Sequence, residues 1–106
     1  MVNDEKIYRI IINPAVNDKM YSHFEFLARV SIDAANNLLD ILLSDINSLQ
    51  NFPYRNPIYN RPYIPKDKYR YLISNSRYRI VYQIEGDYVF IDDIQDCRQS
   101  DISQII

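Results

Sequence analysis

The spacing of hydrophobic and polar residues changes twice along the chain. Residues 5–12 form a run rich in β-branched side chains, without glycine or proline, which predicts a strand. From residue 14 to residue 51, apolar side chains recur every three or four positions, as they do on amphipathic helices. From residue 68 to residue 94, apolar and polar side chains largely alternate, which is typical of half-buried strands.

The helical region divides into two helices at Ser31. The first helix is expected to begin at Asn13-Pro14, because asparagine caps helix N-termini and proline fits the first helical position. The second begins at Ser31 and ends at Asn51-Phe52-Pro53. The junction is so short that the helices must form an antiparallel hairpin. Their apolar stripes are Val16, Met20, Phe24, Leu27 and Val30 on the first helix, and Ala35, Leu38, Leu42, Ile46 and Leu49 on the second.

The rest of the chain predicts a sheet. A loop at 52–66 holds four of the five prolines, interleaved with tyrosines. Gly86 fits a tight turn between the last two strands, since glycine tolerates a positive φ. The predicted fold is α+β, with the order β-α-α-β-β-β in a single domain of residues 1–106: a two-layer sandwich in which the helical hairpin packs on one face of a mainly antiparallel four-stranded sheet. The three later strands are expected at 68–74, 77–84 and 88–94.

Alternation also predicts which side chains share a face of the sheet. Tyr71, Tyr78 and Tyr82 are expected on the helix-facing side or at its rim. Pairing the strand at 68–74 with the strand at 77–84 is expected to bring Arg70 and Arg79 together on the opposite, half-polar face.

Charge is unevenly distributed along the sequence. The net charge is −2 and the pI is about 5.2, but residues 54–79 hold seven positive and one negative side chains, a net of +6. Such asymmetry predicts a basic patch on an acidic body, suited to nucleic-acid phosphates or to an acidic protein. The acidic total argues against a dedicated nucleic-acid binder, which usually has a pI above about 9.

The sharpest candidate chemistry is a set of arginines. Arg70 and Arg79, with Arg98 near them, would bind phosphate and stabilise charge on a phosphodiester in its transition state. Guanidinium cannot act as the general base, and the same arginines would equally solvate an exposed face or pair with acids. The predicted substrate contacts around them are Lys68, Arg77 and Gln83.

Other reactive side chains are isolated. His23 lies on the first helix, away from the strands, and Cys97 has no histidine near it in sequence. Asp92 and Asp93 are expected on opposite sides of their strand, so they do not form an acid–base pair. No metal site, cofactor site or internal disulfide is predicted. The polar N-terminus and the lack of a long apolar run indicate a cytoplasmic protein without a membrane span.

The chain resembles the RelE/ParE superfamily of type II toxin–antitoxin toxins over nearly its whole length. The resemblance is carried by the order of elements and by four segments: Tyr69-Arg70-x-Leu72, Tyr78-Arg79-Ile80-Val81-Tyr82-Gln83-Ile84, Val89-x-Ile91 and Asp96-Cys97-Arg98-Gln99. It implies a growth-inhibiting toxin that forms a hetero-oligomer with a cognate antitoxin. The open sheet face and the tyrosine-rich loop are the expected docking surfaces for that antitoxin.

The resemblance implies two mechanisms and leaves a third reading open. In the ribonuclease branch, which cleaves mRNA on the ribosome, the arginine matching Arg79 contacts the scissile phosphate and a basic residue matching Arg70 lies near it. Leu72 stands where that branch often has another basic residue, and the tail lacks its tyrosine or histidine. The other branch inhibits DNA gyrase. The sequence favours the metal-independent endoribonuclease, with gyrase inhibition or an inactive antitoxin-binding module as alternatives.

Overall fold

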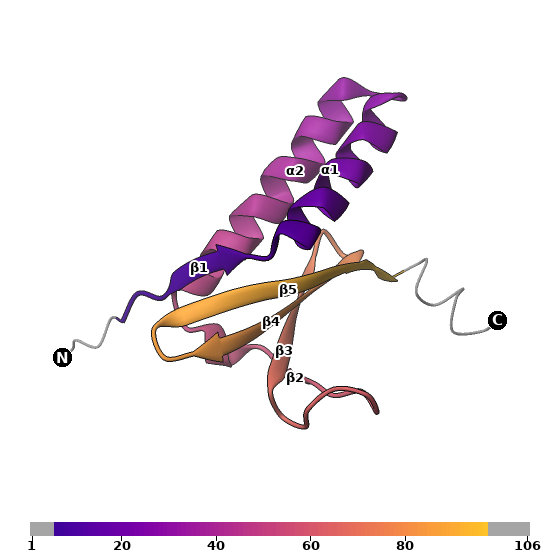
Figure 1. Ribbon diagram of the computed structural model, residues 1–106. Helices are drawn as coiled ribbons and strands as arrows, with labels where there is room; N and C mark the ends of the chain where they lie inside the picture. The colour runs from indigo at the N-terminus through magenta and orange to yellow at the C-terminus, as the bar shows by residue number, and fades with distance from the viewer. Residues whose placement is uncertain (1–5, 98–106) are drawn as a thin grey trace.

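A computed structural model of the protein describes residues 6–97. Its elements are β1 (Arg9–Ile12), α1 (Pro14–Ala28), α2 (Ile32–Asn47), the short 3-10 helices η1 (Ser48–Gln50) and η2 (Pro53–Arg55), β2 (Ile58–Tyr59), β3 (Tyr69–Ser74), β4 (Tyr78–Glu85) and β5 (Tyr88–Asp96). The helical hairpin covers one face of the sheet, and the other face is free of helices (Figure 1). The predicted α+β layout is confirmed.

The sheet has five strands rather than the four predicted, in the order β1-β5-β4-β3-β2. β1 runs parallel to β5, and every other neighbouring pair is antiparallel. The additional strand is β2, only two residues long, which pairs Ile58 with Arg70 and Tyr59 with Tyr69. The sequence does not predict β2, because a two-residue strand is too short to show the alternation of apolar and polar side chains.

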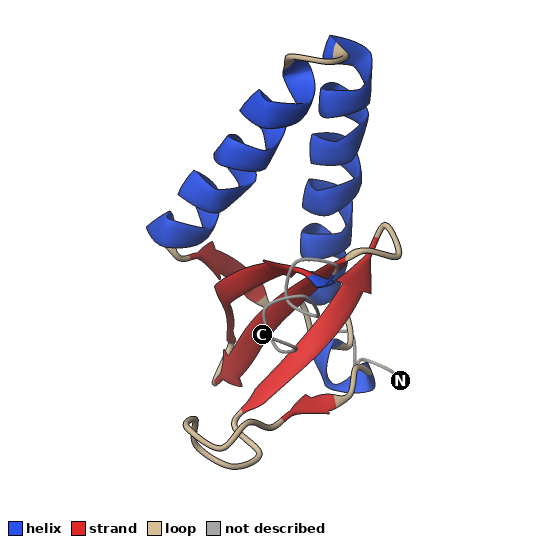
Figure 2. Cartoon of the chain, turned by 90° about the vertical axis from the view of Figure 1, so that its right-hand side faces the viewer, coloured by secondary structure: helices blue, strands red, loops and turns tan. Residues whose placement is uncertain are grey.

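The hairpin begins where the capping residues predict. Asn13 Oδ1 accepts a hydrogen bond from the Ala15 amide at 2.9 Å, and Ser31 Oγ accepts one from the Ala34 amide at 3.1 Å. The end of the hairpin projects beyond the sheet (Figures 1 and 2). Val30, expected in the apolar stripe of the first helix, lies in the turn after α1 and is 82% exposed.

One core joins the two layers. Buried side chains from α1, α2, η1, β4 and β5 form a single cluster, which Ile10 and Ile12 of β1 flank. None of the helices in residues 6–97 is long and apolar enough to cross a membrane. The buried cluster comprises Val16, Met20, Leu38, Leu42, Ile46, Leu49, Tyr78, Ile80, Tyr82, Val89, Ile91 and Ile94.

The register of β3 and β4 separates the two arginines that were expected together. Arg70 lies opposite Tyr82, whereas Arg79 lies opposite Ile73. Directly paired residues share a face, so Arg70 is on the helix-facing side and Arg79 on the open side. The connection leaves three residues, 75–77, between the paired positions Ser74 and Tyr78. The predicted strand limits implied two, and one additional residue reverses the faces.

The same register corrects the position of Tyr71. Tyr71 pairs with Val81 and lies on the open face with Arg79, not beside the helices. Tyr78 and Tyr82 are buried on the helix-facing side, as predicted.

A bulge in β5 corrects the prediction for the paired aspartates. Val81 pairs with Asp93 and Tyr82 pairs with Ile91, so Asp92 is an additional residue in β5. Strict alternation fails at this point. Asp92 and Asp93 consequently line the same hollow on the open face instead of pointing to opposite sides.

Candidate functional site

Arg79 lies at the centre of a tyrosine–arginine cluster on the open face, formed with Tyr59, Tyr71 and Gln95. Its guanidinium carbon is 5.6 Å from the centroid of each tyrosine ring, and Nη1 donates to Gln95 Oε1 at 2.9 Å. The rings of Tyr59 and Tyr71 meet edge to face at 6.0 Å. These contacts fix the guanidinium against β2, β3 and β5.

Hydrogen bonds connect this cluster to the first helix. Gln95 Nε2 donates to the Tyr59 hydroxyl at 3.2 Å and to Asp93 Oδ2 at 3.0 Å. Lys19 of α1 reaches over and pairs with Asp93 Oδ1 at 2.6 Å. Arg79 itself forms no carboxylate pair within residues 6–97, and its Nε is buried without a hydrogen-bond partner. Its position therefore depends on stacking and on Gln95.

A hollow of about 280 Å³ opens beside the cluster. On the strand side, Asp92 accepts a hydrogen bond from Gln83 at 2.6 Å. On the loop side, Arg61 also stacks on Tyr59, with its guanidinium carbon 4.4 Å from the ring centroid. The hollow thus combines tyrosine faces with both signs of charge. Its lining is Tyr59, Arg61, Ile64, Tyr69, Val81, Asp92, Asp93 and Gln95.

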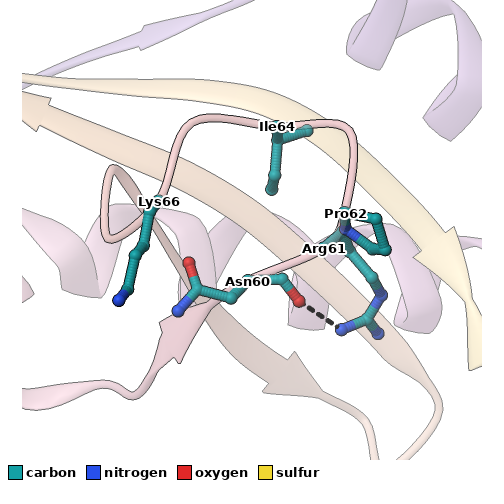
Figure 3. Close-up of a pocket in the computed structure, with 5 residues that line it drawn as sticks. All are labelled: Asn60, Arg61, Pro62, Ile64 and Lys66. Atoms are coloured by element: carbon teal, nitrogen blue, oxygen red, sulfur yellow. Dashed lines mark hydrogen bonds between the residues drawn. The ribbon is translucent and has the colours of Figure 1, made fainter.

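The loop between β2 and β3 is held closed by its own side chains. Asn60 Oδ1 accepts from the Asp67 amide at 2.9 Å, and Asn60 Nδ2 donates to Asp67 Oδ1 at 3.2 Å. Figure 3 shows Arg61 beside Asn60, whose carbonyl accepts its Nη1 at 2.9 Å, and Lys66 on the other side of the same loop. This closure presents Arg61 to the open face.

Arg70 belongs to a different part of the molecule. Its Nη1 donates to the carbonyls of Asn56 at 2.6 Å and Tyr54 at 3.1 Å, and its guanidinium carbon is 5.2 Å from the Tyr54 ring centroid. Arg70 therefore braces the segment around η2 and is not part of the cluster around Arg79.

The other predicted contacts are dispersed. Arg77 pairs with the buried carboxylate of Asp96, Nη2 to Oδ2 at 2.8 Å, and this hydrogen bond raises the pKa of Arg77. Lys68 is exposed, with its ammonium 5.7 Å from the Tyr69 ring centroid. Gln83 lies on the open face, where its side-chain amide donates to Asp92. Arg98 lies outside the described residues.

His23 is remote from Arg79. Its ring packs edge to face on Tyr78 at 5.3 Å, on the helix-facing side of the sheet. Burial lowers the pKa of His23. The positive charges of Arg77 and Lys19 lower this pKa further, and the negative charge of Asp96 partly opposes them. Cys97 is half-buried, and its amide donates to the Arg77 carbonyl at 2.8 Å. Within residues 6–97, no group of three or more His, Cys, Asp or Glu side chains could hold a metal ion.

Three members of the open-face site were not predicted from the sequence. The sequence pattern puts Tyr59 in a loop and distinguishes Arg61 only as one charge of the basic segment 54–79. It predicts that the last strand ends at residue 94, before Gln95, whereas β5 extends to Asp96. The alternation of Ile94-Gln95-Asp96 after the bulge is the signal that would have placed Gln95 on the open face.

A helical hairpin on one face of a mixed sheet, with an arginine-centred cluster on the other, is the arrangement expected from the resemblance to small toxins. The chain belongs to the ParE toxin family: residues 10–100 match the family described as the ParE toxin of the type II toxin-antitoxin system parDE. It is the toxin member of such a system, and the family implies an antitoxin protein as its partner. A search among curated proteins finds no match to the chain.

Proposed function

We propose that this toxin arrests growth by binding and inhibiting DNA gyrase through its open sheet face, rather than by cleaving RNA. The observation that carries the proposal is the placement of Arg70 and Arg79 on opposite faces. Arg70 and Arg79 therefore cannot act together on one phosphate, as the predicted RNA cleavage would require. Inhibition by binding needs a rigid recognition surface, and the partly buried cluster around Arg79 supplies one on the open face.

The chemistry around Arg79 supports binding over catalysis. The buried Nε, the bond to Gln95 and the two tyrosine contacts hold the guanidinium in one orientation. The imidazole of His23, the natural proton-transfer group near neutral pH, is on the other side of the sheet. Arginine between aromatic rings is the type of residue that dominates protein interfaces.

A ribonuclease is the second candidate, because Arg61 places another cation on the open face. Arg61 and Arg79 both stack on Tyr59, at 4.4 and 5.6 Å from its ring centroid. Two cations near the same ring would favour binding of an RNA phosphate on this face. The predicted cytoplasmic location and the hetero-oligomer with a cognate antitoxin belong to both candidates.

The test measures gyrase supercoiling with the purified toxin and, in cells, DNA topology and transcript integrity after induction. Replacement of Arg79 by alanine is expected to weaken gyrase inhibition by about ten-fold or more. Arg79→Lys keeps the charge but loses the planar stacking, so it should restore little. Arg29→Ala, at the exposed end of α1, is the control and should inhibit like the parent.

Thermal unfolding of each variant checks that the cluster has not collapsed. Cleaved ribosome-bound mRNA together with normal supercoiling in arrested cells would contradict the proposal and favour the ribonuclease. Full inhibition of gyrase by a folded Arg79→Ala protein would also overturn it.

A further inference from the structure

We propose that the toxin carries a second binding site, for single-stranded nucleic acid, at the edge hollow where the segment before β1 meets η2. This hollow encloses about 390 Å³ and is lined by Lys6, Tyr8, Phe52, Pro53, Tyr54 and Arg55. It is separate from the cluster around Arg79, and its use does not depend on the proposed action on gyrase.

Exposed aromatic rings are the first reason. Phe52 is 69% exposed and Tyr54 is 58% exposed, although both line the same hollow. The rings of Tyr8 and Tyr54 meet edge to face at 6.5 Å, which orients Tyr54. Aromatic faces held open to solvent are stacking surfaces for unpaired bases.

The backbone at Phe52 is in an energetically unfavourable conformation. Phe52 has φ 54° and ψ 53°, in the left-handed region that a bulky residue rarely adopts. Arg55 Nη1 holds the turn by donating to the carbonyls of Asn51 at 2.6 Å and Phe52 at 3.1 Å. Strain of this kind persists where the surroundings enforce it, and it concentrates at functional sites.

Cations surround the rings. The guanidinium of Arg70 stacks on Tyr54 at 5.2 Å, and the ammonium of Lys6 lies 4.9 Å from the Tyr8 centroid. Lys6 pairs with Asp87 at 3.0 Å, but that pair is exposed to solvent on both sides. Arg55 and Arg70 donate only to neutral oxygens within the described residues, so their charges remain uncompensated. Phosphates would compensate them.

The combination selects among ligands. A free phosphate or an acidic peptide would use the cations and leave Phe52 and Tyr54 unused. Duplex DNA keeps its bases stacked inside the helix, away from protein rings. Only a single strand offers phosphates and free base faces to the same hollow. The shared chemistry covers RNA and DNA, and the experiment includes both.

Binding is tested by fluorescence anisotropy of the full chain with labelled eight-nucleotide oligomers: single-stranded DNA and 2′-O-methyl RNA, which resists ribonucleases. We expect binding by one or both, weakening steeply between 50 and 200 mM salt. Phe52→Gly should weaken it by about five-fold or more, the loss expected from one stacked base. Glycine also relieves the positive φ, so this variant should fold at least as well as the parent.

Phe26→Ala is the matched control, since Phe26 is 70% exposed but lies on α1. It should bind like the parent, and Arg79→Ala should also keep oligomer binding, which separates this site from the gyrase proposal. The inference is overturned if Phe52→Gly binds as tightly as the parent or if duplex DNA binds as tightly as a single strand. Complete displacement of the oligomer by an equal concentration of polyglutamate would also overturn it, in favour of an acidic protein partner.

Discussion

At the scale of single residues, the hydroxyl of Tyr82 connects the sheet to the proline-rich loop. Tyr82 is fully buried, yet its hydroxyl donates to the Pro53 carbonyl at 2.5 Å and accepts from Asn56 Nδ2 at 3.0 Å. Burial raises the pKa of Tyr82, so the phenol stays protonated and keeps donating. One buried oxygen thereby positions the segment that carries Phe52 and Tyr54.

His23 is the residue through which neutral-to-acid pH should act on stability. Its pKa lies below 6.5 because burial disfavours the charged ring, so the unfolded chain binds the proton more tightly. The stability that depends on neutral His23 is present above about pH 6.5 and is lost as pH falls below it. His23→Phe keeps a ring against Tyr78 and removes the titration.

We therefore expect the free energy of unfolding of His23→Phe to change less than that of the parent between about pH 7.5 and 5.5. Urea unfolding at a series of pH values measures both slopes. Since His23 is the only histidine in the chain, no other imidazole contributes to the difference. Identical slopes would mean that the ring is as well hydrated in the folded state as in the unfolded one.

At the scale of elements, the hairpin depends on its caps because its outer part gains little from the sheet. Ser31 satisfies the Ala34 amide where α2 begins, beyond the edge of the strands. Ser31→Ala should lower the free energy of unfolding by about 1 kcal/mol. Ser44→Ala, on the exposed side of the same helix, should change it little, and urea denaturation compares the two. An equal or larger loss for Ser44→Ala would contradict the capping role of Ser31, because helix propensity alone favours alanine over serine inside a helix.

Features that depend on neighbouring residues, such as helix starts, could be predicted from the sequence. Features that depend on how strands pair, such as the face on which a side chain lies, could not. Asn13 and Ser31 cap backbone amides only two or three residues further along the chain, so the starts of the helices could be predicted from the local sequence. The faces of Arg70 and Arg79 depend on whether two or three residues connect β3 to β4, a choice made by the whole sheet. A single bulge residue, Asp92, changes the face of a carboxylate in the same way.

The candidate site was predictable only through Arg79. Its contacts come from β2, β3 and β5, at separations of 8 to 20 residues, and the two-residue strand that supplies Tyr59 has no pattern of its own. The motif around Arg79 therefore identified the family, whereas the neighbours of Arg79 had to be found in space.

At the scale of the whole molecule, the shared core should make the two layers unfold together. Leu42 of α2 is 1% exposed and lies in the cluster that contains Tyr78 and Tyr82 of β4. Leu42→Ala should cost about 3–5 kcal/mol, through lost burial and the cavity left behind. Its neighbour Leu43, 36% exposed, provides the control, and Leu43→Ala should cost less than about 1 kcal/mol.

Far-UV circular dichroism follows mainly the helices, and tyrosine fluorescence follows mainly the sheet, whose strands hold six of the ten tyrosines, during the same urea titration. In the Leu42→Ala protein both signals should move to lower urea by the same amount. A shift of the helical signal alone would mean that the hairpin unfolds as a separate unit.

The pairing of β1 with β5 also bears on how the toxin is made. Within residues 6–97, β5 is the only strand beside β1, so Arg9–Ile12 must wait for Tyr88–Ile91 before it can enter the sheet. Closing so long a loop is entropically costly and comes late in folding. During synthesis β1 and the two helices emerge before the other strands, and the sheet that bears Arg79 is completed only after β5 emerges. The cluster around Arg79 is complete only when Gln95 of β5 has joined it, so it forms only after nearly all of residues 6–97 have been synthesised.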